Sequence, residues 1–318
     1  MVRVLILTDQ KKSSENQANA LFNNLKYQSR KKLYKETKVI VREYFHFLPN
    51  RIIYFILKIK SLFFPNKKCK YSLIISCGRI TAPYSLILKQ ESSNARNIHI
   101  LNPYLNSESF DTVILPNHDK KKASRTVLNS IGILADKNKL NFTKSQSSKL
   151  EKVLDLQKKK IITILIGGSG KSSTMSVNDI KPVFDVITGL KNKYKVIFLF
   201  SRRTPVIIKK FIINKKRSVD SFYPQNDLNP YWFLLNRSDS ILVTADSISM
   251  TSEALLTGKP IIIIPIKKIK EKIKNFHFEL KKRGLIKFLQ KDIILWKNNS
   301  LDESKRIAYL VKRKIGLF

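Results

Sequence analysis

The chain has 318 residues, a length that predicts two domains or one large α/β unit at about 150 residues per domain. Hydrophobic residues make up 43% of it and charged residues 26%, which excludes intrinsic disorder, collagen and small disulfide-held scaffolds. Its 61 lysines and arginines against 23 aspartates and glutamates give a net charge of +38.

This positive charge favours an anionic partner. Nucleic acid is not the partner we expect, because the lysines are spread along the chain and no zinc-finger, RRM or basic-zipper pattern accompanies them. An anionic membrane surface is the second candidate. Since lysine and isoleucine are both abundant, a biased genomic composition is an alternative source of the charge.

The first residues and the cysteines bear on where the protein works. The opening MVRVLILTD predicts a buried first strand and lacks the basic start, long apolar stretch and cleavage site of a signal peptide. Cys69 and Cys77 are the only cysteines, so neither a structural zinc site nor a disulfide framework is expected. Both features favour a cytosolic protein.

Short apolar runs recur along the chain, each followed by a turn and then a helical pattern. Continuous apolar strands that alternate with helices are typical of parallel sheets covered on both faces. We therefore predict an α/β fold. The predicted strands cover residues 2–7, 73–76, 98–101, 112–115, 161–166, 195–200, 240–243 and 260–265.

Residues 51–70 mix isoleucine, phenylalanine, tyrosine and leucine with basic residues. The most apolar part, residues 52–64, is interrupted by Lys58 and Lys60 and is too short and too charged to span a bilayer. A basic apolar helix can instead lie in the membrane interface. The alternative is a helix that faces the core.

Residues 138–160 break the alternation with serine, threonine, glutamine and lysine, and a new strand follows at once. We therefore predict two Rossmann-like domains, residues 1–150 and 151–318, with the last helix as a candidate to pack back on the first domain. Two such domains would place a cleft between the carboxyl ends of their sheets, where ligands of these folds bind.

Three of the nine glycines, Gly167, Gly168 and Gly170, directly follow a predicted strand. Glycines there allow close approach to a ligand, and exposed amides with the next helix N-terminus favour phosphate. Ser169 and Lys171 add a hydroxyl donor and a cation. A tight turn without a ligand is one alternative. A P-loop is another, but its first glycine falls on residue 165, which is leucine.

The next strand ends in Ser201-Arg202-Arg203-Thr204. Arginines at the mouth of a parallel sheet bind phosphate or carboxylate well, because their donors form a rigid fork. Ordinary surface arginines are the alternative.

A later strand ends at residue 243, and a turn and a helix follow it. Asp246 and Ser247 begin the turn, and Ser249, Met250 and Glu253 lie near the start of the helix. Glu253 is placed to accept from ribose hydroxyls. A plain N-capping network is the alternative reading.

Several segments resemble the mitochondrial-fission (elongated mitochondria) protein family, whose bacterial members are described as glycosyltransferases, and the third region resembles the donor-binding segment of GT-B glycosyltransferases. The segments are colinear: TDQKKSSENQ (8–17), CGRITAPYSLIL (77–88), LPNHD (115–119), LIGGSGK (165–171), SRRTP (201–205), NPYWFLL (229–235) and TADSISMTSEALLTGKP (244–260).

The resemblance implies a GT-B fold and a metal-independent glycosyltransferase that uses a nucleotide-diphosphate sugar as donor and binds no permanent cofactor. The glycine loop would meet the diphosphate and Glu253 the ribose, while Arg202 and Arg203 neutralise the departing diphosphate. The acceptor would be a lipid-linked molecule of the cell-envelope glycolipid or lipopolysaccharide type. The location would then be cytoplasmic, or peripheral on the cytoplasmic face of the inner membrane.

The chain departs from the family in its first loop, where a G-K-x-G-H-E-N-Q type run is replaced by QKKSSENQ. Transfer needs a base for the acceptor hydroxyl, and the sequence leaves several candidates. His118 follows a strand and precedes Asp119, which could orient it or act itself. Asp9 and Glu15, after the first strand, are the rivals.

Two other functions remain open. Eukaryotic members of the family are implicated in recruiting a dynamin-related GTPase, so a non-catalytic scaffold of the mitochondrial-fission type is one. A sugar-nucleotide 2-epimerase on the same fold is the other.

Overall fold

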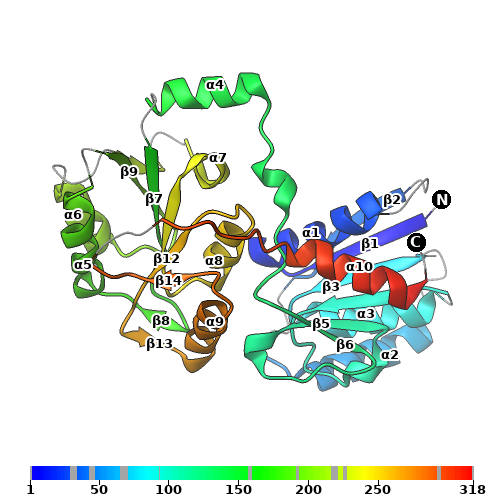
Figure 1. The fold of residues 1–318 in the computed structure, drawn as a ribbon. Coiled ribbons are helices and arrows are strands. Elements are labelled where there is room, and N and C mark those ends of the chain that lie inside the picture. The colour runs from blue at the N-terminus through cyan, green and yellow to red at the C-terminus, as the bar shows by residue number, and fades with distance from the viewer. Residues whose placement is uncertain are drawn as a thin grey trace. The chain divides into compact units, whose positions relative to one another are not determined.

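The computed structural model describes residues 2–28, 34–42, 47–64, 71–92, 94–156, 160–190, 193–215, 221–224, 228–291 and 295–316. Cys69 and the end of the predicted apolar segment, residues 65–70, lie outside them. The chain divides into two compact units (Figure 1). Unit 1 comprises Met1–Asp136 and Asp302–Phe318, and unit 2 comprises Lys137–Leu301.

The division falls at residue 137, whereas the sequence placed it at 151. Residues 137–143 contact unit 2 through aromatic rings: Phe142 packs edge-on against Phe233 at 5.3 Å between ring centroids. The ammonium of Lys139 lies 5.1 Å above the ring of Trp232. These contacts hold Lys139 and Phe142 to two adjacent aromatic residues of unit 2.

The described residues of unit 1 form a six-stranded parallel sheet in the order β2-β1-β3-β4-β5-β6. The apolar runs predicted at residues 2–7, 73–76, 98–101 and 112–115 are confirmed as strands. The strands are β1 Val2–Thr8, β2 Tyr34–Ile40, β3 Leu73–Cys77, β4 Arg96–Ile100, β5 Thr112–Pro116 and β6 Val127–Ser130.

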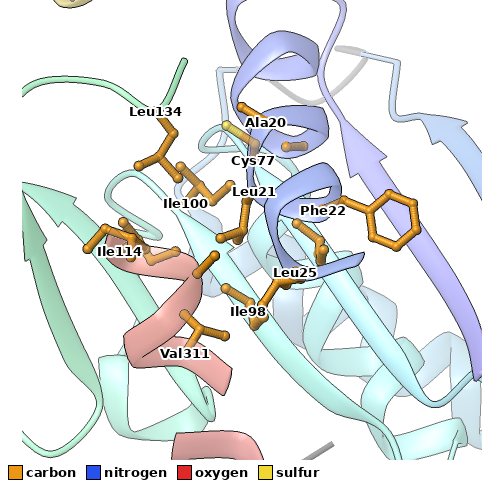
Figure 2. Close-up of a cluster of buried hydrophobic side chains, with 14 of the residues drawn as sticks. Ala20, Leu21, Phe22, Leu25, Cys77, Ile98, Ile100, Ile114, Leu134 and Val311 are labelled. Atoms are coloured by element: carbon orange, nitrogen blue, oxygen red, sulfur yellow. The ribbon is translucent and has the colours of Figure 1, made fainter. Parts of the chain in front are cut away.

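One face of this sheet is covered by α1 (Lys12–Gln28) and α10 (Glu303–Ile315), which also contact each other. Leu21 and Leu25 of α1 and Val311 of α10 pack on Ile98 and Ile100 of β4, as Figure 2 shows. All five side chains are buried. The C-terminal helix therefore completes the core of unit 1.

The other face is covered by α3 (Thr81–Glu91), on which α2 (Asn50–Phe63) packs. Only Asn50 and Ile53 of α2 are buried, so α2 is not the core-facing helix that the sequence left as one alternative. Two short 3-10 turns, Ser107–Ser109 and Asn117–Asp119, precede and follow β5.

Unit 2 repeats the pattern, with the described strands in the order β10-β9-β7-β11-β12-β14, all parallel. Its four predicted apolar runs are confirmed as strands. The strands are β7 Lys160–Ile166, β9 Tyr194–Phe200, β10 Ser221–Tyr223, β11 Ser240–Thr244, β12 Ile261–Ile264 and β14 Lys287–Phe288. A small antiparallel pair joins β8 Ser173–Thr174 to β13 Lys268–Ile269.

The helices of unit 2 connect these strands. They are α4 Lys144–Val153, α5 Val177–Thr188, α6 Val206–Asn214, α7 Tyr231–Arg237, α8 Ile248–Leu255 and α9 Glu271–Lys282, with a 3-10 turn at Lys137–Leu140. Within the described ranges, no helix of either unit is long and apolar enough to cross a membrane.

Candidate functional site

The order of strands in unit 2 puts a topological switch point between β7 and β11. After β7 the chain builds β9 and β10 on one side and then returns to build β11 and β12 on the other. In open parallel sheets a crevice forms at such a point, outside the carboxyl ends of the strands. The register pairs Leu165 with Val243 and Ile166 with Phe200, so the three predicted binding segments meet there.

Asp246 holds these segments together. It accepts hydrogen bonds from the amide of Gly168 (2.8 Å) and the hydroxyl of Thr244 (2.7 Å), and its side chain is inaccessible to solvent. Burial raises the pKa of Asp246, while those two donors and the charge of Arg203 oppose the rise in its pKa. Asp246 is therefore a buried clamp rather than a group open to a ligand.

The glycines are needed because neighbouring groups approach their α-carbons. A Cβ on Gly167 would overlap the carboxylate of Asp246, and a Cβ on Gly168 would overlap the backbone carbonyl of Arg203. The amides of Gly167 and Gly168 donate to Thr244 and Asp246, and that of Gly170 to Ser173. We expected these amides to point at a ligand, but in the structure they donate to acceptors of the protein itself.

The next helix also begins later than expected. α5 starts at Val177, after the strand β8, and its N-terminus is closed by Asp179, which accepts from the amide of Ser176 at 2.8 Å. The Ser169 hydroxyl accepts from the amide of Met175 at 3.1 Å, and Lys171 is exposed. The cation of Lys171 is the group of this loop that remains open to an anion.

The Ser201–Thr204 turn packs on the glycine loop. The hydroxyls of Ser201 and Thr204 donate to the carbonyl of Gly167 at 3.0 and 2.6 Å. This anchoring places Arg203 over the loop, where its Nη2 lies 3.7 Å from Oδ2 of Asp246 and half of its side chain stays exposed. Arg202 is exposed beside it. Two exposed guanidinium groups thus follow the carboxyl end of β9, and that of Arg203 lies beside the glycine loop.

Glu253 stands on α8, the helix that follows β11. The helix is N-capped by Ser247, whose hydroxyl accepts from the amide of Met250 at 3.2 Å, and Ser249 and Met250 are half-buried in its first turn. The hydroxyl of Tyr231 donates to Oε2 of Glu253 at 2.6 Å. Burial raises the pKa of Glu253, against the effect of Tyr231 and of Lys139.

Tyr231 is a residue that the sequence reasoning did not assign. It lies in the NPYWFLL segment at the start of α7, and nothing in that segment marks its hydroxyl as a partner of a carboxylate on α8. Burial and the neighbouring Glu253 carboxylate raise the pKa of Tyr231 well above its usual value, so it stays a hydrogen-bond donor.

Unit 1 has its own switch point, between β1 and β3, and Asp9 follows β1 there. Its carboxylate accepts from the amide and the ammonium of Lys11, both at 3.1 Å. Gly78, with φ of +101°, lies so close that a Cβ would stand 2.6 Å from Oδ2 of Asp9. Buried Ser14 completes the cluster, so Asp9 is tightly held although its loop lacks the family's glycines.

Two other base candidates of unit 1, His118 and Asp119, lie apart from Asp9. His118 and Asp119 are half-buried in the turn after β5. Two strands separate β5 from β1, which puts His118 about 14 Å from Asp9 at ~4.8 Å per strand. Glu15 stands in the first turn of α1, paired with the ammonium of Lys12 at 2.7 Å. His118 and Asp119 therefore do not form one catalytic group with Asp9.

Metal binding was not expected from the sequence. Among the described residues, no group of three or more histidine, cysteine, aspartate or glutamate side chains could hold a metal ion.

A model of the family described as Mitochondrial fission ELM1 matches residues 14–315. The chain is 30% identical over 281 residues to "Uncharacterized protein RP120" of Rickettsia prowazekii, covering 76% of this chain and 78% of that protein. It is 24% identical over 273 residues to the mitochondrial fission protein ELM1 of Arabidopsis thaliana, covering 77% of this chain and 64% of that protein. The chain thus spans less than two thirds of the plant protein's length.

Solved structures with a similar fold include UDP-GlcNAc 2-epimerase from Neisseria meningitidis bound to UDP-GlcNAc, with a TM-score of 0.61 and 15% identity over 99% of this chain and 92% of that one. The UDP-GlcNAc 2-epimerase from Methanocaldococcus jannaschii has a TM-score of 0.59 and 12% identity, over 98% of this chain and 100% of that one. At such identities the likeness is one of fold, and it confirms the α/β, GT-B-like architecture.

Proposed function

The chain belongs to the mitochondrial fission ELM1 family, and we propose that it is a nucleotide-sugar enzyme of that family whose unit 2 binds the nucleotide diphosphate of the donor. The observation that carries this proposal is that Arg203 lies over the glycine loop at the switch point between β7 and β11, with Glu253 on the helix that follows β11. A cation for phosphate and an acceptor for hydroxyls, at the carboxyl ends of a parallel sheet, suit a nucleotide.

Arg202 and Arg203 would bind the diphosphate. Arg203 meets only one carboxylate in the described chain, at 3.7 Å, and half of its side chain is exposed, so it keeps donors for a ligand. Phosphate oxygens take two parallel hydrogen bonds from a guanidinium. The exposed Lys171 adds a further cation at the glycine loop.

Glu253 would bind the ribose. Tyr231 occupies Oε2 of its carboxylate, and the described residues offer no second hydrogen-bond donor to it, which leaves Oε1 for sugar hydroxyls. A fixed, partly buried acceptor discriminates strongly in favour of a ligand with a matching hydroxyl, because a missing partner leaves the buried carboxylate unsatisfied. Ser249, half-buried and one turn before Glu253 on α8, is placed to contribute a hydroxyl.

The reaction that we propose is glycosyl transfer without a metal. The bond between the sugar's anomeric carbon and the diphosphate breaks, and the diphosphate leaves with the electron pair. The guanidinium groups stabilise the charge that builds on it, the electrostatic contribution that such a transfer most needs. The acceptor hydroxyl forms the new bond and gives its proton to a base, for which Asp9, Glu15, His118 and Asp119 remain the candidates.

The donor that we propose is a uridine-diphosphate sugar, because the solved structures of similar fold include one bound to UDP-GlcNAc and one with UDP. The acceptor that we propose is a cell-envelope glycolipid, as the family resemblance implies. A 2-epimerase remains the second candidate, since the N. meningitidis and M. jannaschii proteins are 2-epimerases.

Calorimetric titration tests the donor site. UDP, uridine, GDP, CMP, ADP and ATP are titrated into the protein and into three variants, Arg203→Ala, Glu253→Gln and Arg283→Ala. The last is the matched control, because Arg283 caps the C-terminal end of α9 and pairs with Glu279. We expect Arg203→Ala to weaken the binding of UDP about 10-fold or more and to leave the binding of uridine unchanged, since the guanidinium would contact the phosphates and not the nucleoside. Glu253→Gln should weaken the binding of both UDP and uridine, because it changes the acceptor that meets the ribose.

Other outcomes contradict the proposal or redirect it. Binding of ATP with magnesium that ignores Glu253 would indicate a P-loop site. The absence of nucleotide binding in folded protein would favour the scaffold. Conversion of the sugar of UDP-GlcNAc to its C2 epimer without any acceptor would favour the 2-epimerase over the transferase.

A further inference from the structure

Helix α2 is attached to unit 1 along a narrow face. Asn50 anchors its start, donating from Nδ2 to the carbonyls of Arg79 and Pro103 at 2.6 Å each. Ile53 is the other buried residue, and Tyr54 packs against the hydrophobic cluster under α3. Leu57 and Ser61 are half-buried, and the remaining residues of the helix are exposed.

The outward face of α2 is apolar. At 100° per residue, six exposed side chains fall within a sector of about 120°, opposite the face that contacts the unit. Phe55 and Phe63, for example, are 63% and 75% exposed. The six residues are Ile52, Phe55, Ile56, Ile59, Leu62 and Phe63.

Basic side chains border this apolar face on both sides. On the same helical geometry, Arg51 and Lys58 lie along one edge and Lys60 along the other. All three are exposed, and the helix contains no acidic residue. The arrangement is that of an amphipathic helix whose charged rim surrounds, rather than opposes, its apolar face.

Proteins that work alone in water rarely leave so many large apolar side chains together on one surface. A lipid interface satisfies both features, because the apolar side chains enter the acyl boundary while long basic side chains reach the phosphate headgroups. The helix is too short and too charged to cross a membrane. We propose that α2 docks unit 1 onto an anionic lipid surface, lying in the interface.

A second copy of the chain fits this face less well. It would bring the same Arg51, Lys58 and Lys60 against their equivalents, and each copy carries a net charge of +38. Like charges at a contact oppose association, whereas an anionic bilayer gains from every one of them. An apolar face could bind either a second copy of the chain or a lipid surface, and the positive charge around it favours the anionic lipid surface.

Vesicle sedimentation tests the inference. The full chain is mixed with vesicles of phosphatidylcholine alone, or with about one-third phosphatidylserine. Phe55→Ser/Phe63→Ser removes apolar contact, and Val206→Ser/Ile207→Ser is its control, because those two residues of α6 are 66% and 67% exposed. We expect the α2 variant to lose about 10-fold or more in binding to the anionic vesicles, and the α6 variant to bind as the parent does.

A second pair of variants tests the charged rim. Arg51→Glu/Lys58→Glu should weaken binding by about 25-fold or more, at about 5-fold for each basic side chain lost from the surface. Lys272→Glu/Lys282→Glu makes the same change of charge on exposed positions of α9 and should weaken it far less. Raised salt should weaken the binding of the unsubstituted chain to anionic vesicles. The part of the binding that comes from the apolar side chains should remain.

Three outcomes would overturn the inference: no sedimentation with anionic vesicles, equal sedimentation of the α2 and α6 variants, or an α2 variant that changes the oligomeric state but not vesicle binding. All substituted side chains are exposed, so unchanged thermal unfolding serves as the check that each variant is folded. None belongs to the proposed nucleotide site, so failure of that proposal leaves this test intact.

Discussion

The hydroxyl of Tyr231 donates a 2.6 Å hydrogen bond to Oε2 of Glu253, and so ties the start of α7 to α8. Burial raises the pKa of both groups. A hydrogen bond in such a poorly solvated place is stronger than the same bond in water. The carboxylate that we assign to the ribose therefore has one oxygen fixed and its direction set by a residue outside its own helix.

Tyr231→Phe tests that relationship. Because Phe keeps the ring and removes only the hydroxyl, we expect the fold to survive and the affinity for both UDP and uridine to fall about 5- to 20-fold. Calorimetry measures this, with Trp232→Phe as a control on the neighbouring residue. An unchanged affinity for uridine would mean that Tyr231 does not position Glu253 for a nucleoside.

Gly168→Ala should destabilise unit 2. Its new Cβ would overlap the backbone carbonyl of Arg203, which has no flexible end that could move aside. We expect a loss of about 2 kcal/mol or more in the free energy of unfolding, the range typical of steric strain in a packed site. Denaturant unfolding of the variant measures it.

Gly189→Ala is the matched glycine control. No atom lies within 4 Å of the Cβ that alanine would add, and φ is −70°, so alanine adopts the native conformation without strain. We expect the free energy of unfolding to stay unchanged or to rise by about 0.4–1 kcal/mol, because alanine reduces the entropy of the unfolded chain. A loss equal to that of Gly168→Ala would contradict the steric argument.

His99 should make stability fall with acid. Burial lowers the pKa of His99 to about 3, so it stays neutral in the folded protein, next to the hydroxyl of Ser76 at 2.8 Å. In the unfolded chain its pKa is about 6.5, so unfolding takes up a proton between pH 6.5 and 3. Stability is therefore complete above pH 6.5 and falls as the pH drops through that window, by up to about 1.4 kcal/mol per pH unit.

His99→Gln isolates this effect. The variant cannot take up the proton, so its free energy of unfolding should change less than the parent's between pH 6.5 and 5, where most carboxylates remain ionised. Denaturant unfolding at several pH values measures the difference. Parallel pH profiles for parent and variant would show that His99 is not the group responsible.

Cys77 should be unreactive in the folded protein. It is fully buried at the end of β3, and burial, followed by the charge of Asp9, raises the pKa of its thiol. Since the thiolate is the nucleophile, alkylation by iodoacetamide should proceed only through unfolding. The measurement uses a Cys69→Ser background, in which the labelling rate should rise with denaturant. Rapid labelling without denaturant would contradict the burial.

The predicted strands were those whose residues are apolar on both faces, such as Ile161–Ile166 within β7. β2 was not predicted, because it is an edge strand and its central Lys35, Glu36 and Thr37 are exposed. Nothing in an exposed, charged run distinguishes an edge strand from a loop. A run of apolar residues therefore reveals a buried strand, whereas an exposed edge strand such as β2 carries no such run.

The glycine loop shows a different limit. Its position after β7 was predicted correctly, but the sequence assigned its amides to a ligand, and Asp246 takes the amide of Gly168 instead. The two residues are far apart in the chain, and only the strand order brings them together. Tyr231 was missed for the same reason, because its partner Glu253 stands on another helix.

The return of the chain to unit 1 has a consequence for synthesis on the ribosome. Ile307, Ala308 and Val311 of α10 belong to the same buried cluster as residues of β1 and β4, and they are translated only after all of unit 2. At about 5–20 residues per second, the first sheet waits several seconds or longer with the α10 side of that cluster uncovered and α1 alone packed on the face. The nascent first half is thus a natural client for chaperones, whereas unit 2, continuous in sequence, can fold as soon as it emerges.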